Sequence, residues 1–160
     1  MKRLMLLAAV CTGLLFSTTL RAETLKADDV TAGALKVWLS EKYGCKVDED
    51  GDLIVNAKNG KIGISVLSKA SAIRFWSNYG SYDKRSHEEM VRLANQFNDR
   101  KRLLRVSIEP KGGSTASSCD YYLLYPGGLD RANFLTTIEW IDGLKPVWER
   151  TVLDGEVKDK

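Results

Sequence analysis

The chain contains 160 residues, which is the usual size of one domain with a hydrophobic core. Its formal charge of +3 comes from 24 basic and 21 acidic residues, and the excess lies in Lys2, Arg3 and Arg21, within the first 22 positions. Without those positions the charges balance, so the composition gives no electrostatic argument for binding nucleic acid or an anionic membrane surface. The longest apolar run, Leu4–Phe16, is shorter than the roughly 20 residues of a membrane span and argues against an integral membrane protein.

The first 22 residues have the three parts of an export signal. Met1–Arg3 is a positively charged start, Leu4–Phe16 is an apolar segment, and Ala22 provides the small residue that a signal peptidase accepts. We therefore predict cleavage between Ala22 and Glu23, and a mature protein that is periplasmic or secreted. The alternative is an uncleaved signal that anchors the chain in the membrane.

Two cysteines, Cys45 and Cys119, remain after this cleavage. In an oxidising compartment an even pair of cysteines usually forms a disulfide, and a separation of 74 positions excludes a CxxC motif. We therefore predict an intramolecular disulfide between Cys45 and Cys119. Two buried free thiols, or a disulfide between two chains, are the alternatives.

The first part of the mature chain predicts one helix followed by four strands. Apolar residues recur at helical spacing between Asp28 and Tyr43, and Gly44 is a suitable helix end. The pairs Asp50-Gly51 and Asn59-Gly60 suit the tight turns between short strands. The expected strands are 45–48, 53–57, 61–67 and 71–79.

The next part predicts a helix and two further strands. Ser86 and Glu89 have the spacing of a capping box, so a second helix should begin there. Its core-facing stripe consists of Met90, Leu93, Ala94 and Phe97. Strands are expected at 104–108 and 119–125, and the segment 110–118, rich in Gly, Ser and Thr, is expected to be a mobile loop.

A third helix is expected after Asp130, which can cap it. Gly143 and Pro146 should interrupt that helix, because proline lacks an N–H and clashes with the preceding turn. These elements together predict an α+β fold in the order α-β-β-β-β-α-β-β-α. It has a single antiparallel sheet of five to six strands with helices on one face. We expect one domain over residues 23–153 and a flexible tail at residues 154–160.

Two segments carry a resemblance to a known family. The second helix reads Leu93–Asn98 with paired asparagines, and the aromatic strand Ile73–Trp76 precedes it. In these segments and in its element order the chain resembles the YbjN-domain family of candidate bacterial sensory transduction regulators. The resemblance implies a fold like that of type III secretion chaperones, and a role in regulation or protein contact without catalytic residues. The export signal and the two cysteines depart from the cytoplasmic members of such a family.

The residues needed for common catalytic and metal sites are missing from the sequence. His87 is the only histidine, which is too few for a zinc site or a nucleophile triad. The segment Lys111–Thr115 lacks the spacing of a phosphate-binding loop, and Asp48–Asp52 lacks the later acid of an EF-hand. We therefore predict no catalytic residue, no metal and no cofactor, and a protein that is not an enzyme.

A candidate binding surface follows from strand alternation. If the apolar residues of strand 71–79 point to the core, their neighbours point to the other face of the sheet. Exposed Trp, Tyr and Arg are the residue types most enriched at binding hot spots. The candidate binding residues are Arg74, Trp76, Asn78, Arg105 and Tyr122. The alternative for Trp76 is burial as ordinary core.

The sequence thus favours a non-enzymatic exported protein of the YbjN type. It would bind a protein or peptide partner through the open sheet face or an exposed strand edge, with a homodimer as one form. No contact with nucleic acid and no membrane insertion after signal cleavage are expected. The alternatives are a small-ligand-binding protein or an enzyme with a cleft between sheet and helices, and a structural component of the cell envelope.

Overall fold

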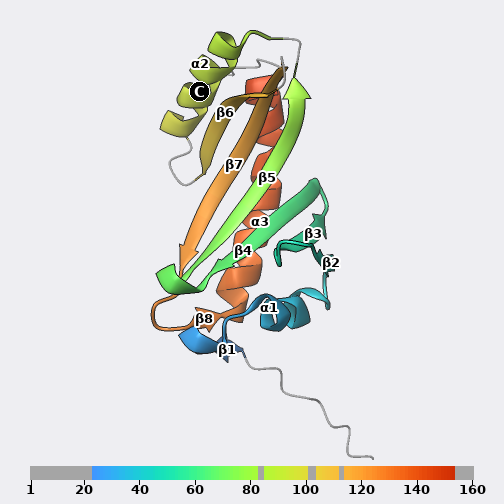
Figure 1. Cartoon of the computed structure of the whole chain (residues 1–160), viewed down its shortest axis with the longest axis vertical. Coiled ribbons are helices and arrows are strands. Elements are labelled where there is room, and N and C mark those ends of the chain that lie inside the picture. The colour runs from blue at the N-terminus through green and yellow to red at the C-terminus, as the bar shows by residue number, and fades with distance from the viewer. Residues whose placement is uncertain (1–22, 83–84, 101–103, 112–113, 154–160) are drawn as a thin grey trace, which may run out of the picture.

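A computed structural model describes residues 23–82, 85–100, 104–111 and 114–153 (Figure 1). The predicted leader at residues 1–22 and the predicted tail at residues 154–160 lie outside the described residues. The structure confirms the α+β class, the antiparallel sheet with helices on one face and, apart from two short additional strands, the element order.

The main sheet has six antiparallel strands in the order β2-β3-β4-β5-β7-β6. In chain order these strands are β2 (Gly44–Val47), β3 (Leu53–Ala57), β4 (Gly60–Leu67), β5 (Ala72–Tyr82), β6 (Arg105–Lys111) and β7 (Ser114–Leu124). The helices are α1 (Ala32–Leu39), α2 (His87–Arg100) and α3 (Arg131–Trp148). A second, two-stranded sheet pairs β1 (Thr24–Leu25) with β8 (Leu129–Asp130), and the sequence did not predict it.

The helix starts follow the capping residues. Ser86 Oγ accepts a hydrogen bond from Glu89 N at 3.2 Å, as the predicted capping box requires, and Asp130 Oδ1 accepts one from Asn133 N at 2.8 Å. Thr31 Oγ1 caps α1 in the same way. As a result α1 begins later than the sequence predicted, and residues 27–29 form a separate 3₁₀ turn.

The prediction that Pro146 interrupts the third helix is wrong, since α3 runs from Arg131 to Trp148 without a break. A proline at this position leaves the carbonyl of Asp142, four residues earlier, without its helical N–H partner. Asn59 Nδ2 donates a hydrogen bond to that carbonyl at 3.0 Å. The turn between β3 and β4 therefore supplies the donor that the helix lacks.

The predicted mobile loop at residues 110–118 is also wrong, because most of this segment is strand. β6 extends to Lys111 and β7 begins at Ser114, and Lys111 is paired with Ser114. Pro110 fits in an edge strand because a residue there needs no N–H when its backbone points away from the neighbouring strand. Length and composition alone could not reveal this placement.

The predicted disulfide between Cys45 and Cys119 is wrong. Both cysteines are free, and they lie on β2 and β7 with three strands between them. Strands are about 4.8 Å apart, so four spacings separate the two residues by roughly 19 Å. A disulfide requires Cα atoms within about 7 Å of each other. The sheet topology therefore excludes a bond within one chain.

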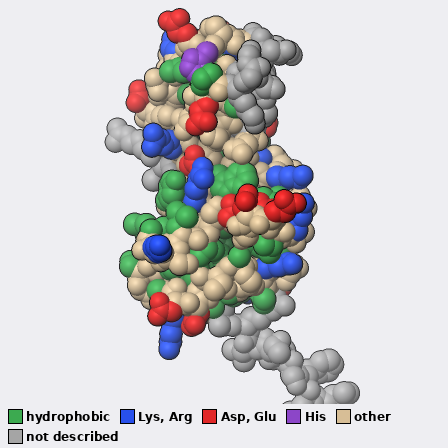
Figure 2. Space-filling model, viewed as in Figure 1, with side chains coloured by type: hydrophobic (Ala, Val, Ile, Leu, Met, Phe, Trp, Pro, Cys, Tyr) green, Lys and Arg blue, Asp and Glu red, His purple; other side chains and the backbone are tan. Residues whose placement is uncertain are grey.

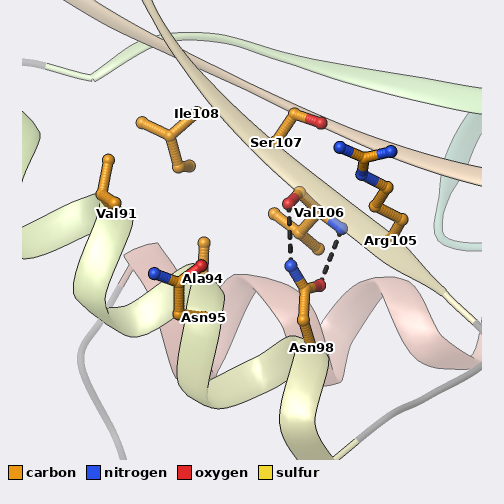
Figure 3. Close-up of a pocket in the computed structure, with 8 residues that line it drawn as sticks. All are labelled: Val91, Ala94, Asn95, Asn98, Arg105, Val106, Ser107 and Ile108. Atoms are coloured by element: carbon orange, nitrogen blue, oxygen red, sulfur yellow. Dashed lines mark hydrogen bonds between the residues drawn. The ribbon is translucent and has the colours of Figure 1, made fainter.

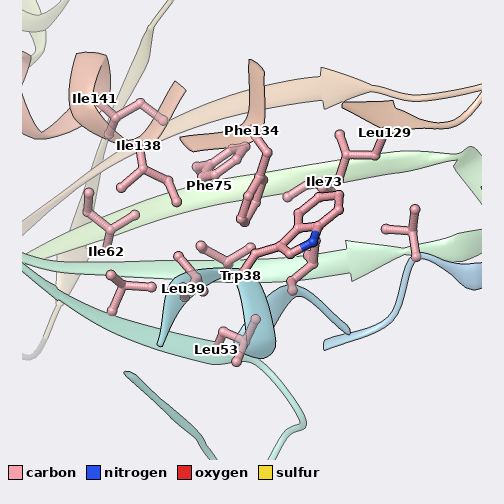
Figure 4. Packing of buried hydrophobic residues seen from close by; sticks show 14 of the residues in the cluster. Trp38, Leu39, Leu53, Ile62, Ile73, Phe75, Leu129, Phe134, Ile138 and Ile141 are labelled. Atoms are coloured by element: carbon pink, nitrogen blue, oxygen red, sulfur yellow. The ribbon is translucent and has the colours of Figure 1, made fainter. Parts of the chain in front are cut away.

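The covered face of the sheet holds two hydrophobic clusters. In the larger cluster, α1 and α3 pack against β3, β4 and β5, and the ring of Phe134 lies 6.0 Å from Trp38 and 5.9 Å from Phe75, centroid to centroid (Figure 4). In the smaller cluster, α2 packs against β6 and β7 and against the end of α3. There the rings of Phe97 and Trp148 meet edge to face with centroids 5.4 Å apart. All three helices, α1, α2 and α3, thus pack against the same face of the main sheet.

Candidate binding surface

None of the described helices lies on the other face of the main sheet. In Figure 1 α3 runs behind the strands, so Figure 2, drawn from the same side, shows this open face. On β5, Ile73 and Phe75 are buried against the helices, and the alternate residues Arg74, Trp76 and Asn78 lie on the open face. Successive residues of β5 therefore alternate between the hydrophobic core and the candidate binding surface.

The strand register brings the five predicted residues onto this same face. Trp76 is opposite Asp120 of β7, and Asp120 is in turn opposite Arg105 of β6. Arg74 is opposite Tyr122. Four of the five predicted residues thus form two adjacent rows across β5, β7 and β6. The fifth, Asn78, lies one row further along, opposite Ser118, and is exposed.

The indole of Trp76 lies flat against the backbone of Gly63 on β4. A Cβ atom built at Gly63 would fall 2.1 Å from a ring atom of Trp76, so only glycine leaves room for the ring. Trp76 Nε1 donates a hydrogen bond to Ser65 Oγ at 3.1 Å, and Ser65 Oγ donates to Asp52 Oδ2 at 2.7 Å. Trp76 is half-buried, and its ring lies over the backbone of β4 on the face that the described helices leave open. The ring is therefore held in one orientation on an uncovered sheet.

The charged part of the face is built around Asp120. Arg74 Nε donates a hydrogen bond to Asp120 Oδ1 at 2.6 Å, and the two form an ion pair. Arg105 lies opposite Asp120 in the register and is exposed. This part of the face therefore combines the Arg74–Asp120 ion pair with a further exposed arginine, and the carboxylate of Asp52 lies near Trp76.

Exposed apolar side chains continue the face toward the ends of β4 and β7. Leu67 is 37% exposed, Tyr122 is 51% exposed and Leu124 is 68% exposed. Leu67 and Leu124 both flank Ala72 in the register, one from each side. Large exposed apolar residues that gather in one place on a small protein often mark an interaction site.

The sequence did not identify the residues that position Trp76 and Arg74. Gly63, Ser65, Asp52 and Asp120 were missed because each contributes through a neighbouring strand. One local signal was available, since a glycine inside an alternating strand often marks a close approach of another group. The partner of Arg74 could not be found locally, because Asp120 lies 46 positions away.

A groove between α2 and β6 is the structure's counterpart of the predicted cleft between sheet and helices (Figure 3). Its volume is about 260 Å³, below the range of about 300–1,000 Å³ that is usual for ligand pockets. Asn98 lies at one end and accepts from Val106 N at 2.8 Å and donates to Val106 O at 3.0 Å. The groove is lined by Val91, Ala94, Asn95, Asn98, Arg105, Val106, Ser107 and Ile108.

A buried polar group lies between the two hydrophobic clusters. Lys145 of α3 donates hydrogen bonds to Lys61 O and to Ser77 Oγ, both at 3.0 Å. Burial lowers the pKa of the Lys145 amine and raises the pKa of the nearby Cys119 thiol to about 11. Ser77, Lys145 and Cys119 are all buried. Because these three side chains are buried, we assign them a structural role in the fold.

Three further observations concern metal binding, the histidine and membrane insertion. No group of three or more His, Cys, Asp or Glu side chains is placed to hold a metal ion in the part of the chain that the structure describes. His87 is exposed at the first position of α2. Among the described helices, none combines the length and the apolar character that crossing a membrane requires.

Comparison with known proteins identifies the fold. No family model matches the chain, and no curated protein matches it in sequence. The structure is similar to YbjN from E. coli, described as a candidate transcription regulator, with a TM-score of 0.59 and 13% identity over 74% of this chain and 87% of YbjN. It is also similar to an uncharacterized protein from Methanothermobacter thermautotrophicus, with a TM-score of 0.52 and 16% identity over 76% of this chain and 99% of that protein. The chain therefore has a YbjN-like fold, as the resemblance predicted.

Proposed function

We propose that this protein is a non-enzymatic binding module that recognises a protein or peptide partner through the open face of its main sheet. The observation that carries the proposal is the position of Trp76, which packs on Gly63 and bonds to Ser65 on the face that the described helices leave open. A rigid aromatic ring loses little conformational freedom on binding, so its contact area contributes efficiently to affinity.

The chemistry of the face indicates what the partner should present. Arg74 forms an ion pair with Asp120, and Arg105 of the same row is exposed, so Arg105 could attract a carboxylate of the partner. Leu67, Tyr122 and Leu124 offer an apolar surface beside them. A partner segment that combines apolar side chains with an acidic residue fits both features.

The likeness to YbjN adds support for regulation, because YbjN is described as a candidate transcription regulator. Export forms part of the proposal, since the first 22 residues have the composition of a signal peptide. Cell fractionation with detection of the shortened chain tests this part by itself.

Affinity capture tests the surface directly. The wild-type mature chain, Trp76→Ala and Asn56→Ala would each be immobilised and exposed to periplasmic extract, and retained proteins would be quantified by mass spectrometry. Asn56 is an exposed open-face residue of β3 and serves as the matched control. We expect a protein that the wild type and Asn56→Ala retain equally and that Trp76→Ala retains at about one tenth of that level or less. Equal retention by all three chains would reject the open face as the binding surface.

A further inference from the structure

The two edges of the main sheet differ in how they are protected. On the β6 edge, the side chain of Asn98 bonds both the N–H and the carbonyl of Val106 (Figure 3). Pro110, on the same edge, has no N–H to offer. Since outward-facing backbone groups alternate along a strand, these two residues and α2 close most of this edge to another strand.

The β2 edge lacks such protection. Asp48 N donates to Asp52 O at 2.9 Å, which fixes the hydrogen-bonding pattern between β2 and β3. In this pattern Gly44 and Lys46 bond toward β3, and the backbone groups of Cys45 and Val47 point away from the sheet. Among the described residues, no turn, cap or side-chain hydrogen bond reaches those outward groups.

The side chains of β2 are also suited to pairing. Val47 is 42% exposed and Cys45 is half-buried, and both lie on the covered side of the sheet. Lys46 lies on the open side, and Asp48 follows two positions later on that side. A hollow of about 480 Å³ lies along this end of β2, lined by Lys46, Val47, Asp48, Glu49 and Asp50.

We infer that β2 pairs antiparallel with β2 of a second copy, around a twofold axis at Lys46. In this register Cys45 lies opposite Val47 of the second copy, and the four outward backbone groups at these positions on each chain form four hydrogen bonds. The apolar Cys45 and Val47 then meet on the covered side. On the open side the two Lys46 residues lie directly opposite each other, which opposes pairing. Each Lys46 also lies diagonal to Asp48 of the second copy, and this contact between opposite charges offsets part of the repulsion.

The consequence is one continuous sheet across two copies, with the two open faces side by side. The interface contains only a short strand from each copy, so the dimer should be weak and should depend on protein concentration. This inference does not rest on the partner binding proposed above. Variants of the β2 edge should leave Trp76 and its surroundings unchanged.

Cross-linking tests the register. At the twofold axis the two Lys46 residues would form a non-hydrogen-bonded pair with Cα atoms about 4.5 Å apart, which is within disulfide range. A Cys45→Ser/Lys46→Cys chain treated with oxidised glutathione should therefore run mainly as a covalent dimer on a non-reducing gel. The matched control is Cys45→Ser/Asn56→Cys, which places the thiol on the same face but one strand inward. Equal amounts of dimer from the two chains, or none from either, would overturn the inference.

Sedimentation equilibrium provides a second test without a new thiol. The wild type should show a concentration-dependent dimer at millimolar concentration, and Val47→Pro, which removes an outward N–H, should remain monomeric. If Val47→Pro loses its native circular dichroism, Val47→Lys replaces it, because a charge on an edge strand also opposes pairing. A wild-type chain that stays monomeric, or edge variants that dimerise as well as the wild type, would contradict the inference. Trp76→Ala should dimerise normally, which separates this result from the open-face proposal.

Discussion

The two faces of the main sheet show how one strand can serve stability and recognition at the same time. Phe75 is 1% exposed and contacts Phe134 and Tyr121, whereas its neighbour Trp76 lies on the uncovered face above Gly63. The helices cover only the face of Phe75. The fold therefore depends on the residues of that face, and the side chains opposite are available to a partner.

The sharpest test of this comparison is a pair of adjacent substitutions. Phe75→Ala should lower the free energy of unfolding by about 3–5 kcal/mol, because it empties a site inside the larger cluster. Trp76→Ala should cost less, since the indole already contacts solvent on one side. Urea denaturation measures both values, and equal losses would show that the open face is part of the core.

Gly63→Ala tests the position of the Trp76 ring without replacing Trp76 itself. The added methyl group would overlap the indole, so the ring must move and the hydrogen bond to Ser65 should break. We expect a loss of about 1–3 kcal/mol in the free energy of unfolding. The control is Gly143→Ala in α3, where nothing lies within 4 Å and stability should rise by up to about 1 kcal/mol. A crystal structure of Gly63→Ala with the indole in its original place would refute this packing.

The covered face contains a charge whose effect should depend on pH. Burial lowers the pKa of Lys145, so the folded protein loses this proton at a lower pH than the unfolded chain, whose amine titrates near 10.5. At a pH between the pKa of Lys145 in the folded protein and its pKa in the unfolded chain, unfolding takes up a proton. The free energy of unfolding therefore rises with pH in this range. The free energy of unfolding of the wild type should therefore rise relative to that of Lys145→Met as pH approaches 10.5. Denaturation of both chains between pH 7 and 10 measures the difference, and a constant difference would contradict the burial of the amine.

The two cysteines offer the mildest test, because labelling does not require a substitution. Cys119 is buried on β7, which has a neighbouring strand on each side, and burial raises the pKa of its thiol to about 11. Cys45 lies half-buried on the edge strand β2. Near pH 8 an aromatic disulfide reagent should label one thiol in the native mature chain, which lacks Cys11, and two in urea. Rapid labelling of both thiols in the native protein would mean that the covered face opens readily.

Local patterns in the sequence predicted the strands and their faces. In the sequence, Ile62, Ile64 and Val66 alternate with smaller residues, and this alternation matches the covered face of β4. Ser86 and Asp130 likewise indicated two helix starts. These features depend on neighbours in sequence, which is why they could be found there. The five candidate residues on the open face followed from the same alternation.

The features that the sequence did not reveal depend on distant contacts. Asn59 supplies the donor that allows α3 to continue through Pro146, although the two residues are far apart in the chain. The separation of Cys45 from Cys119 follows from the strand order, which no local pattern encodes. For the same reason the contact of Trp76 with Gly63 became evident only in the folded chain.

The central claim is that the open face is the working surface of this protein. Calorimetric titration of the partner retained in the capture experiment into wild-type and Trp76→Ala chains tests it most directly. The account predicts at least about tenfold weaker binding to Trp76→Ala, with the variant still fully folded at the measuring temperature. Equal affinity for the two chains would contradict it.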